Sequence, residues 1–356
     1  MSYELNKKIR KIEPYEAVYK YYDIKLDANE SCFDISREMV DEIAEAVKNV
    51  SFNRYPDPTA AEVVIRFAQY YGIRPEYVTA ANGSDEMISI LLSAFIEKDD
   101  MVVTLSPDFS MYAFYGYLYE AKITNLPKDN SLQINVGKVI DYCNTHDVKA
   151  LIFSNPCNPT SLGLSREDVV RLVKNVFCLV VIDEAYMDFY GESVMDLVDE
   201  YDNLVVLKTC SKAMGMAGLR LGFAVAGENI STALRTVKSP YNVNSLTQAV
   251  CSAVLKNKAL ISEHTVEIIE SRKLLQSRLH ALSKKYSALE KVYDSVTNFV
   301  FVKSSVSEMI CDKLLEKSIS VYCLGSYFRV TAGTLEEDEI FLTELEKILA
   351  ADYTEE

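Results

Sequence analysis

The sequence predicts an α/β protein with a mostly parallel central sheet, helices on both faces of that sheet, and a smaller α+β domain. Between residues 78 and 227, short runs of valine, isoleucine and leucine alternate with helix-like segments, and each run ends in a polar or glycine-bearing turn. Continuous apolar runs of this kind are typical of strands buried on both faces of a parallel sheet. After Pro240 there is neither glycine nor proline until Gly325, which favours long helices and indicates a second structural unit.

The composition is that of an ordinary globular protein large enough for two domains, with 356 residues, 49% apolar and 25% charged. The net charge of −15 argues against a nucleic-acid partner, which would require a basic face. Eight scattered cysteines form no CxxC pair, so no metal site and no disulfide framework is expected. No run approaches the roughly 18 apolar residues of a membrane span, and the charged N-terminus is not a signal peptide. We expect a cytoplasmic protein with no membrane partner.

The first elements are an irregular arm over residues 1–35 and a helix over residues 36–50, where apolar side chains recur with helical periodicity. A second helix follows a proline-stiffened loop. Thr59 and Glu62 have the spacing of a capping box at its start, and Gly72 is placed to end it.

The central part of the chain contains the expected strands, near residues 101–106, 150–154, 179–183, 204–207 and 221–227. In a parallel sheet, ligands bind beyond the carboxyl ends of the strands. Asn158, Asp183, Tyr186 and Lys212 each come just after such a run. Asn158 could instead form only a turn in an Asn-Pro loop, and Asp183 could simply cap the turn that follows it.

The chain is organised around residues 209–223, TCSKAMGMAGLRLGF, which connect two expected strands. Four of the 12 glycines lie between positions 215 and 227, which suggests tight turns or close approach to a ligand. Lys212 is surrounded there by small and apolar residues. A lysine in such surroundings tends to have a lowered pKa, which leaves its amine free to act as a nucleophile. The alternative is a surface lysine beside a strand.

The C-terminal third begins with a long helix expected over residues 244–286, which would connect the two domains. Strands are expected at residues 297–303 and 326–334, and amphipathic helices at 308–318 and 335–349. We therefore predict an arm at 1–35 that joins the small domain, a large domain at 36–235, and a connector with the small domain at 236–356.

Nine short motifs resemble those of class I/II pyridoxal-phosphate-dependent aminotransferases in order and approximate spacing, most closely the histidinol-phosphate aminotransferase branch. They are EPY (13–15), LDANE (26–30), NRYPDP (53–58), NGSDE (82–86), NPT (158–160), DEAY (183–186), SK (211–212), AGLRLG (217–222) and FRVTAGT (328–334). The resemblance covers nearly the whole chain. It implies a fold-type I enzyme that is a homodimer with shared active sites and uses pyridoxal 5′-phosphate.

The resemblance also implies roles around the cofactor ring. Lys212 would attach the cofactor covalently and later move protons as general acid and base. Asp183 would keep the ring nitrogen protonated. Asn158 and Tyr186 would hydrogen-bond the ring oxygen O3′. Phe109 would stack on the ring, although it could equally be a core residue.

A second group of residues would hold the cofactor phosphate. Ser84 and Asp85 open a helix whose free N–H groups form an anion site. Ser211 and Arg220 add a hydroxyl and a permanent cation. Tyr55 resembles a residue that reaches the phosphate in the neighbouring subunit, although it could instead pack its own loop.

The substrate residues implied by the resemblance are Arg329, which would bind an anionic group, together with Tyr15 and Asn158. The branch usually carries another arginine several residues earlier, whereas this chain has Tyr322 near that position. Ser161 also replaces a common glycine. The implied reaction moves an amino group between an amino donor and 2-oxoglutarate. Histidinol phosphate is the expected donor, with aromatic amino acids as competitors.

Two other functions remain open. The same cofactor framework could serve a decarboxylase of an amino-acid phosphate, because the reaction depends on which bond at Cα stands perpendicular to the ring. A cofactor-binding regulatory domain would need an appended basic helix-turn-helix, and the acidic chain has no spare residues for one. Serine-hydrolase chemistry is not indicated, since none of the three histidines of the chain lies near one of these motifs.

Overall fold

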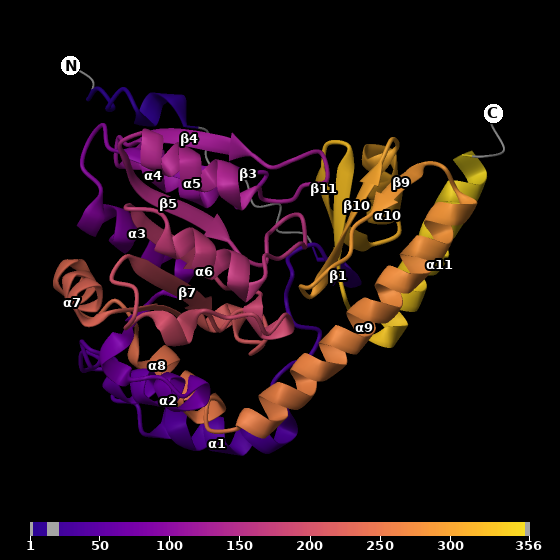
Figure 1. The fold of residues 1–356 in the computed structure, drawn as a ribbon. Helices are drawn as coiled ribbons and strands as arrows, with labels where there is room; N and C mark the ends of the chain where they lie inside the picture. The colour runs from indigo at the N-terminus through magenta and orange to yellow at the C-terminus, as the bar shows by residue number, and fades with distance from the viewer. Residues whose placement is uncertain (1–2, 13–20, 353–356) are drawn as a thin grey trace.

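Among the residues that the structure describes, the larger of two sheets has seven strands and forms the centre of the molecule (Figure 1). The computed structural model describes residues 3–12 and 21–352. The strands lie in the order β2 (Val78–Ala81), β8 (Gly222–Ala226), β7 (Leu204–Thr209), β6 (Leu179–Asp183), β5 (Val148–Ser154), β3 (Met101–Ser106) and β4 (Lys122–Pro127). Strand β8 runs antiparallel to both of its neighbours, β2 and β7, and the pairs from β7 to β4 are all parallel. The predicted fold class is confirmed.

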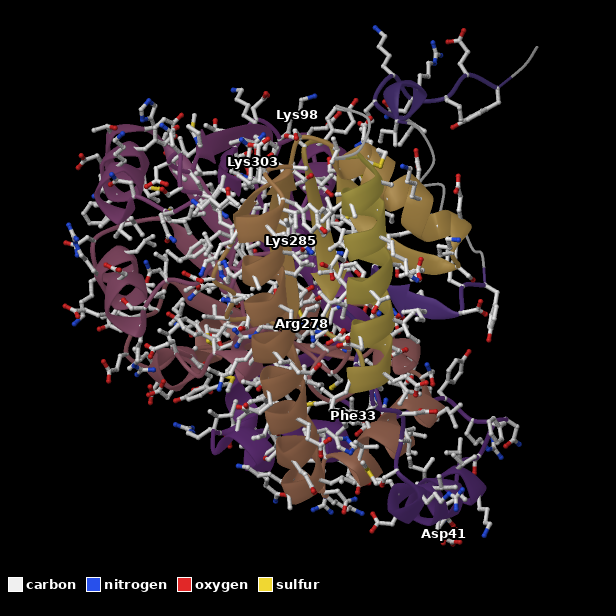
Figure 2. The ribbon with its side chains drawn as sticks, turned by 90° about the vertical axis from the view of Figure 1, so that its right-hand side faces the viewer. Phe33, Asp41, Lys98, Arg278, Lys285 and Lys303 are labelled. Atoms are coloured by element: carbon white, nitrogen blue, oxygen red, sulfur yellow. The ribbon has the colours of Figure 1, made fainter. Side chains whose placement is uncertain are left out.

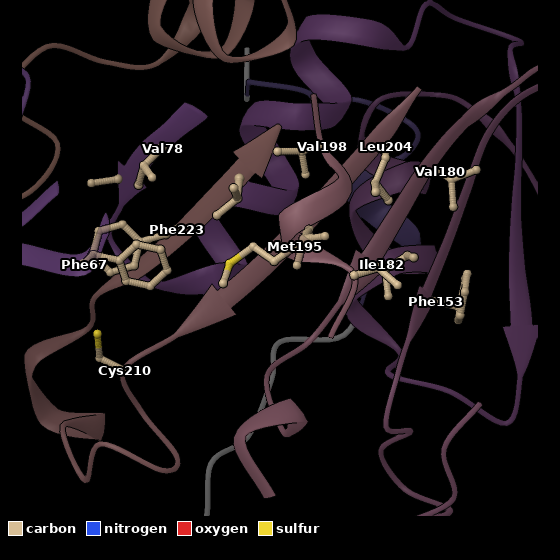
Figure 3. Packing of buried hydrophobic residues seen from close by; sticks show 14 of the residues in the cluster. Phe67, Val78, Phe153, Val180, Ile182, Met195, Val198, Leu204, Cys210 and Phe223 are labelled. Carbon is tan, nitrogen blue, oxygen red and sulfur yellow. The ribbon is translucent and has the colours of Figure 1, made fainter. Parts of the chain in front are cut away.

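Helices cover both faces of this sheet because successive side chains along each strand point to opposite sides. One apolar core contains Val206 of β7 together with α1 (Arg37–Lys48), α2 (Ala61–Tyr71), α5 (Val136–Thr145), α6 (Arg166–Lys174) and α8 (Ser245–Val254). The other contains Leu207 with α3 (Gly83–Phe95), α4 (Met111–Leu118) and α7 (Glu228–Val237). Figure 3 shows the first core, in which the rings of Phe67 and Phe223 stack 4.0 Å apart.

The smaller sheet has five strands in the order β1 (Ile24–Leu26), β11 (Ile319–Leu324), β12 (Tyr327–Thr331), β10 (Phe299–Ser304) and β9 (Leu289–Val292). It packs against α9 (Lys258–Lys285), α10 (Ser307–Glu316) and α11 (Leu335–Asp352). Figure 2 shows α9 and α11 side by side, where Arg278 and Lys285 of α9 form ion pairs with Glu339 and Glu346 of α11.

Strand β1 connects the N-terminal arm with the C-terminal third of the chain. It pairs in parallel with β11, with Ile24 opposite Ile319. The last part of the N-terminal arm is therefore built into the small sheet, while the exact domain boundaries at 35/36 and 235/236 stay a prediction. Short 3₁₀ helices lie at Ile9–Lys11, Pro75–Tyr77, Met187–Phe189, Met195–Leu197 and Ala217–Leu219. Across the described parts of the chain, no helix combines the length and apolar character needed to cross a bilayer.

The start of α2 differs from the sequence prediction. The expected capping box at Thr59 does not form, because the Asp57 carboxylate accepts the N–H groups of Thr59 (2.9 Å) and Ala61 (2.8 Å). Ala60 precedes the helix with a left-handed φ of 51°. At the other end, Gly72 closes the helix with a φ of 71°, as predicted.

The expected connector helix over residues 244–286 is in fact two helices. Helix α8 ends at Val254 and α9 begins at Lys258. The apolar side of α8 packs into the core of the large sheet, whereas Leu275 and Leu279 of α9 pack into the core of the small sheet. The break lets the chain leave one core and enter the other.

Candidate active site

The predicted site residues converge where the strands of the large sheet point towards the small sheet (Figure 1). Asp183 ends β6, and Lys212 follows β7 by three residues. Asn158 comes four residues after β5. From the small sheet, Arg329 of β12 donates from Nη1 to the side-chain oxygen of Asn158. One hydrogen bond thus links the two sheets across the site.

Lys212 has the environment of a nucleophilic amine. Its Nζ donates to the carbonyl of Ala28 at 2.8 Å and lies 5.8 Å from the ring centroid of Tyr186. Burial, and secondarily the positive charge of Arg329, lowers the pKa of Lys212 from 10.5 to about 8. An appreciable fraction of the amine is therefore neutral near pH 7.

Asp183 is a buried carboxylate, 4% exposed. Its Oδ2 accepts from the hydroxyl of Tyr112 at 2.9 Å, and its Oδ1 accepts from the N–H of Ala185 at 3.0 Å. Burial raises the pKa of Asp183 to about 6 despite these two bonds. Both donors are neutral, so a positively charged ligand group beside Asp183 would be favoured.

Arg329 lies between two aromatic rings and is itself only 6% exposed. Its guanidinium carbon is 4.4 Å from the ring centroid of Tyr322 and 5.3 Å from that of Phe299. Its Nε is buried and makes no hydrogen bond within the described residues. Tyr322 is 43% exposed and stands next to Arg329 on the paired strand β11. These contacts fix a cation at the site with an aromatic ring over it.

The predicted phosphate residues come together at the first turn of α3. A guanidinium Nη2 of Arg220 contacts Asp85 at 3.1 Å, and its Nη1 lies 3.5 Å from the hydroxyl of Ser211. Gly222 allows β8 to approach this turn, since a Cβ there would lie 2.5 Å from the backbone nitrogen of Ser84. Free N–H groups, a hydroxyl and a cation at a helix N-terminus form an anion-binding site.

Three further residues were predicted for the site: Phe109, Tyr55 and Tyr15. Phe109 is partly buried, with its ring edge-on to that of Tyr112 at 5.5 Å. Tyr55 is 81% exposed and stacks on Tyr241 with ring centroids 4.7 Å apart. Tyr15 and the EPY motif fall in residues 13–20, outside the residues that the structure describes.

Residues 27–30 contact the site, although the sequence analysis gave them no role there. Three successive residues each hydrogen-bond to a different site residue: the carbonyl of Asp27 with Arg329 (2.6 Å), the carbonyl of Ala28 with Lys212 (2.8 Å), and the amide of Asn29 with Tyr186 (2.9 Å). The only sequence signal was the motif LDANE itself. Tyr112 was also missed, although it lies three residues after Phe109 and so close to it at the start of α4.

Comparisons with known proteins bear on the family and the fold of the chain. Residues 22–345 match the family model for aminotransferases of class I and II. Histidinol-phosphate aminotransferase from Clostridium novyi (strain NT) is 39% identical over 337 residues, which cover 93% of each chain. The protein of that name from Clostridium kluyveri (strain NBRC 12016) is 38% identical over 346 residues, covering 96% of this chain and 97% of the relative. The structure of Sinorhizobium meliloti histidinol-phosphate aminotransferase in complex with pyridoxal-5′-phosphate has the same fold, with a TM-score of 0.89 at 19% identity over 99% of both chains.

Proposed function

This chain belongs to the class I and II aminotransferase family, and from that premise we propose that it transfers an amino group from histidinol phosphate to 2-oxoglutarate. It is a pyridoxal-phosphate-dependent aminotransferase that acts on an amino donor and a 2-oxo acid. The observation that carries the proposal is the buried amine of Lys212, with a pKa of about 8, at the same edge of the sheet as the carboxylate of Asp183 and an anion site at α3. The names of the relatives support the substrate.

The residues present fit pyridoxal phosphate. Lys212 would hold its aldehyde carbon, and Asp183, whose described partners are neutral, would hold the proton on its ring nitrogen. The first turn of α3 with Ser211 and Arg220 would hold its phosphate. When bound, the cofactor supplies an electron sink for the negative charge that develops at the substrate Cα.

The chain's own groups then move the proton. The Nζ of Lys212 can accept a proton from Cα and return it, because its pKa lies close to neutral pH. The charge of Asp183 keeps the ring-nitrogen proton in place during that transfer. Arg329 orients the anionic end of the substrate, and its bonds to Asn158 and Asp27 hold the guanidinium still.

The assembly we propose is a cytoplasmic homodimer with shared active sites. Tyr55 is 81% exposed, and Phe52, three residues earlier, is 76% exposed. Tyr241, against which Tyr55 stacks, is also exposed. An exposed aromatic patch of this kind supports contact with a second subunit. In that dimer Tyr55 would reach the phosphate held by the partner chain.

The test is turnover of histidinol phosphate with 2-oxoglutarate, which is measured as the formation of glutamate. We expect glutamate to form with purified protein loaded with the cofactor, and not with Lys212→Ala. The decarboxylase alternative predicts release of carbon dioxide from an amino-acid phosphate without any need for 2-oxoglutarate. Loss of carbon dioxide without glutamate formation would show that the proposed reaction is wrong.

A further inference from the structure

We propose that Asn29, oriented by Thr331, is a positioning residue that makes the hydroxyl of Tyr186 donate its hydrogen bond into the active site. The inference rests on the proposed contact between Tyr186 and the ring oxygen O3′ of the cofactor. It concerns the direction of one O–H bond and therefore has a consequence that a purely structural role would not have.

Asn29 is held in one place by several bonds. Its side chain is buried (1% exposed), and its backbone has a left-handed φ of 54°, which asparagine tolerates better than most residues. Its N–H donates to the hydroxyl of Thr331 at 3.0 Å, and its carbonyl accepts from Asn298 at 3.1 Å. The loop therefore presents the amide of Asn29 to the site in a fixed position.

The hydrogen bonds of Thr331 determine the orientation of the side-chain amide of Asn29. The Oγ1 of Thr331 accepts the backbone N–H of Asn29, and it donates its own proton to the side-chain Oδ1 of Asn29 at 3.3 Å. With Oδ1 committed to Thr331, Nδ2 is the atom that faces the hydroxyl of Tyr186, at 2.9 Å. An amide nitrogen only donates, so Tyr186 accepts this hydrogen bond.

The direction of the Tyr186 O–H bond follows. A phenol has one proton, and Asn29 cannot accept it through Nδ2. Burial raises the pKa of Tyr186, which keeps the hydroxyl protonated at neutral pH. The proton is thus available to a ligand oxygen in the site. A hydrogen bond to an anionic oxygen stabilises its charged form, so this donor lowers the pH at which the bound cofactor changes its protonation state.

The experiment is a pH titration of the visible absorbance of the cofactor-loaded protein, comparing wild type with Asn29→Gly. Glycine accepts the left-handed backbone and removes the amide without adding charge. We expect the midpoint of the titration to rise by about half to one pH unit, the effect of losing the orientation of one hydrogen bond. An unchanged midpoint would overturn the proposal.

A double-mutant cycle separates positioning from a general structural effect. In the Tyr186→Phe background, Asn29→Gly should add no further shift, because the hydroxyl that it orients is gone. Equal shifts in both backgrounds would show that Asn29 does not act through Tyr186. If Tyr186→Phe alone leaves the midpoint unchanged, the proposed contact of Tyr186 with the cofactor is wrong as well. If Tyr186→Phe shifts it and Asn29→Gly does not, only the present inference fails.

Thr331 offers a matched pair of variants. Thr331→Ser keeps the hydroxyl that orients the amide, and we expect the wild-type midpoint. Thr331→Val keeps the shape but removes the hydroxyl, so the amide of Asn29 can turn over and accept from Tyr186. The midpoint of the valine variant should then move upward in the same direction as that of Asn29→Gly. Identical midpoints for the serine and valine variants would contradict the role of Thr331.

Discussion

Lys212 and Asp183 lie at the ends of neighbouring strands, and burial moves their pKa values in opposite directions, each towards the neutral form. When the cofactor binds, Asp183 would gain a favourable charge interaction and Lys212 would gain a covalent bond. Burial of these two ionisable groups therefore destabilises the cofactor-free protein more than it destabilises the loaded protein. That difference can be measured at each residue.

The first prediction concerns Lys212 as the attachment site. Borohydride reduction of the loaded protein should fix the cofactor on Lys212, and Lys212→Ala should lose both this label and nearly all turnover. Lys208, on strand β7 four residues before Lys212, is an internal control: it is also buried (2% exposed), but its Nζ pairs with Asp188 at 3.1 Å. Peptide mapping that finds the label on Lys208 would refute the assignment.

The second prediction concerns Asp183 and pH. Its folded pKa, about 6, lies above its ordinary value of 3.8, so the free energy of unfolding of cofactor-free protein should fall as pH rises through that range. The loss is on the order of 3 kcal/mol. Asp183→Asn should lack this contribution to the decline, and should unfold at a higher temperature than wild type at pH 7 when free of cofactor. The same variant should lose most of its turnover when loaded. A cofactor-free variant no more stable than wild type at pH 7 would contradict the prediction.

The third prediction concerns Tyr322 and the choice of substrate. Arg329 is one cation, whereas a phosphate dianion favours more donors, so aromatic amino acids should compete well with histidinol phosphate. Tyr322→Arg should raise the ratio of kcat/KM for histidinol phosphate over that for phenylalanine by about one to two orders of magnitude, from one added charge-assisted bond. Tyr322→Phe, which keeps the ring over Arg329, is the matched control. A wild-type preference for histidinol phosphate above about a thousandfold would show that other groups replace the second arginine.

At the scale of elements, the close approach of β8 to α3 would form the proposed phosphate site. A Cβ on Gly222 would lie 2.5 Å from the nitrogen of Ser84, so Gly222→Ala must push the first turn of α3 away. We expect cofactor binding to weaken at least about tenfold, measured as the dissociation constant by fluorescence titration. Gly218→Ala is the control, because a Cβ there meets nothing within 4 Å. Equal dissociation constants for the two variants would show that this approach does not form the site.

The sequence predicted elements whose signals are local. The apolar periodicity over residues 36–50 predicted the helix that forms as α1 (Arg37–Lys48), and Gly72 ends α2 as predicted. The break between α8 and α9 had no glycine or proline to mark it, because it is imposed by two separate cores. The role of Asn29 was missed for the same reason: its partners Tyr186 and Thr331 are 157 and 302 residues away.

At the scale of the whole molecule, the proposed dimer predicts that two inactive variants restore each other. Tyr55→Phe and Lys212→Ala would each inactivate both sites of their own homodimers. In a mixed dimer one site regains both residues, so part of the activity should return after the subunits are mixed and allowed to exchange. Tyr241→Phe is a control that keeps the stacked ring beside Tyr55. A monomer in sedimentation at the assay concentration would rule out shared sites.

The pairing of β1 with β11 also sets the order in which the active site can be completed during synthesis. Residues 27–30 leave the ribosome before the rest of the site, whereas Thr331, which holds Asn29, emerges 302 residues after it. The large sheet, from β2 to β8, leaves the ribosome long before β11 and β12 exist. A nascent chain, or one cut short before Ile319, has no strand on which β1 can pair and no Arg329 to bridge to Asn158. The site therefore stays incomplete until Thr331 has left the ribosome, and a chain cut short before that residue cannot consume the amino donor.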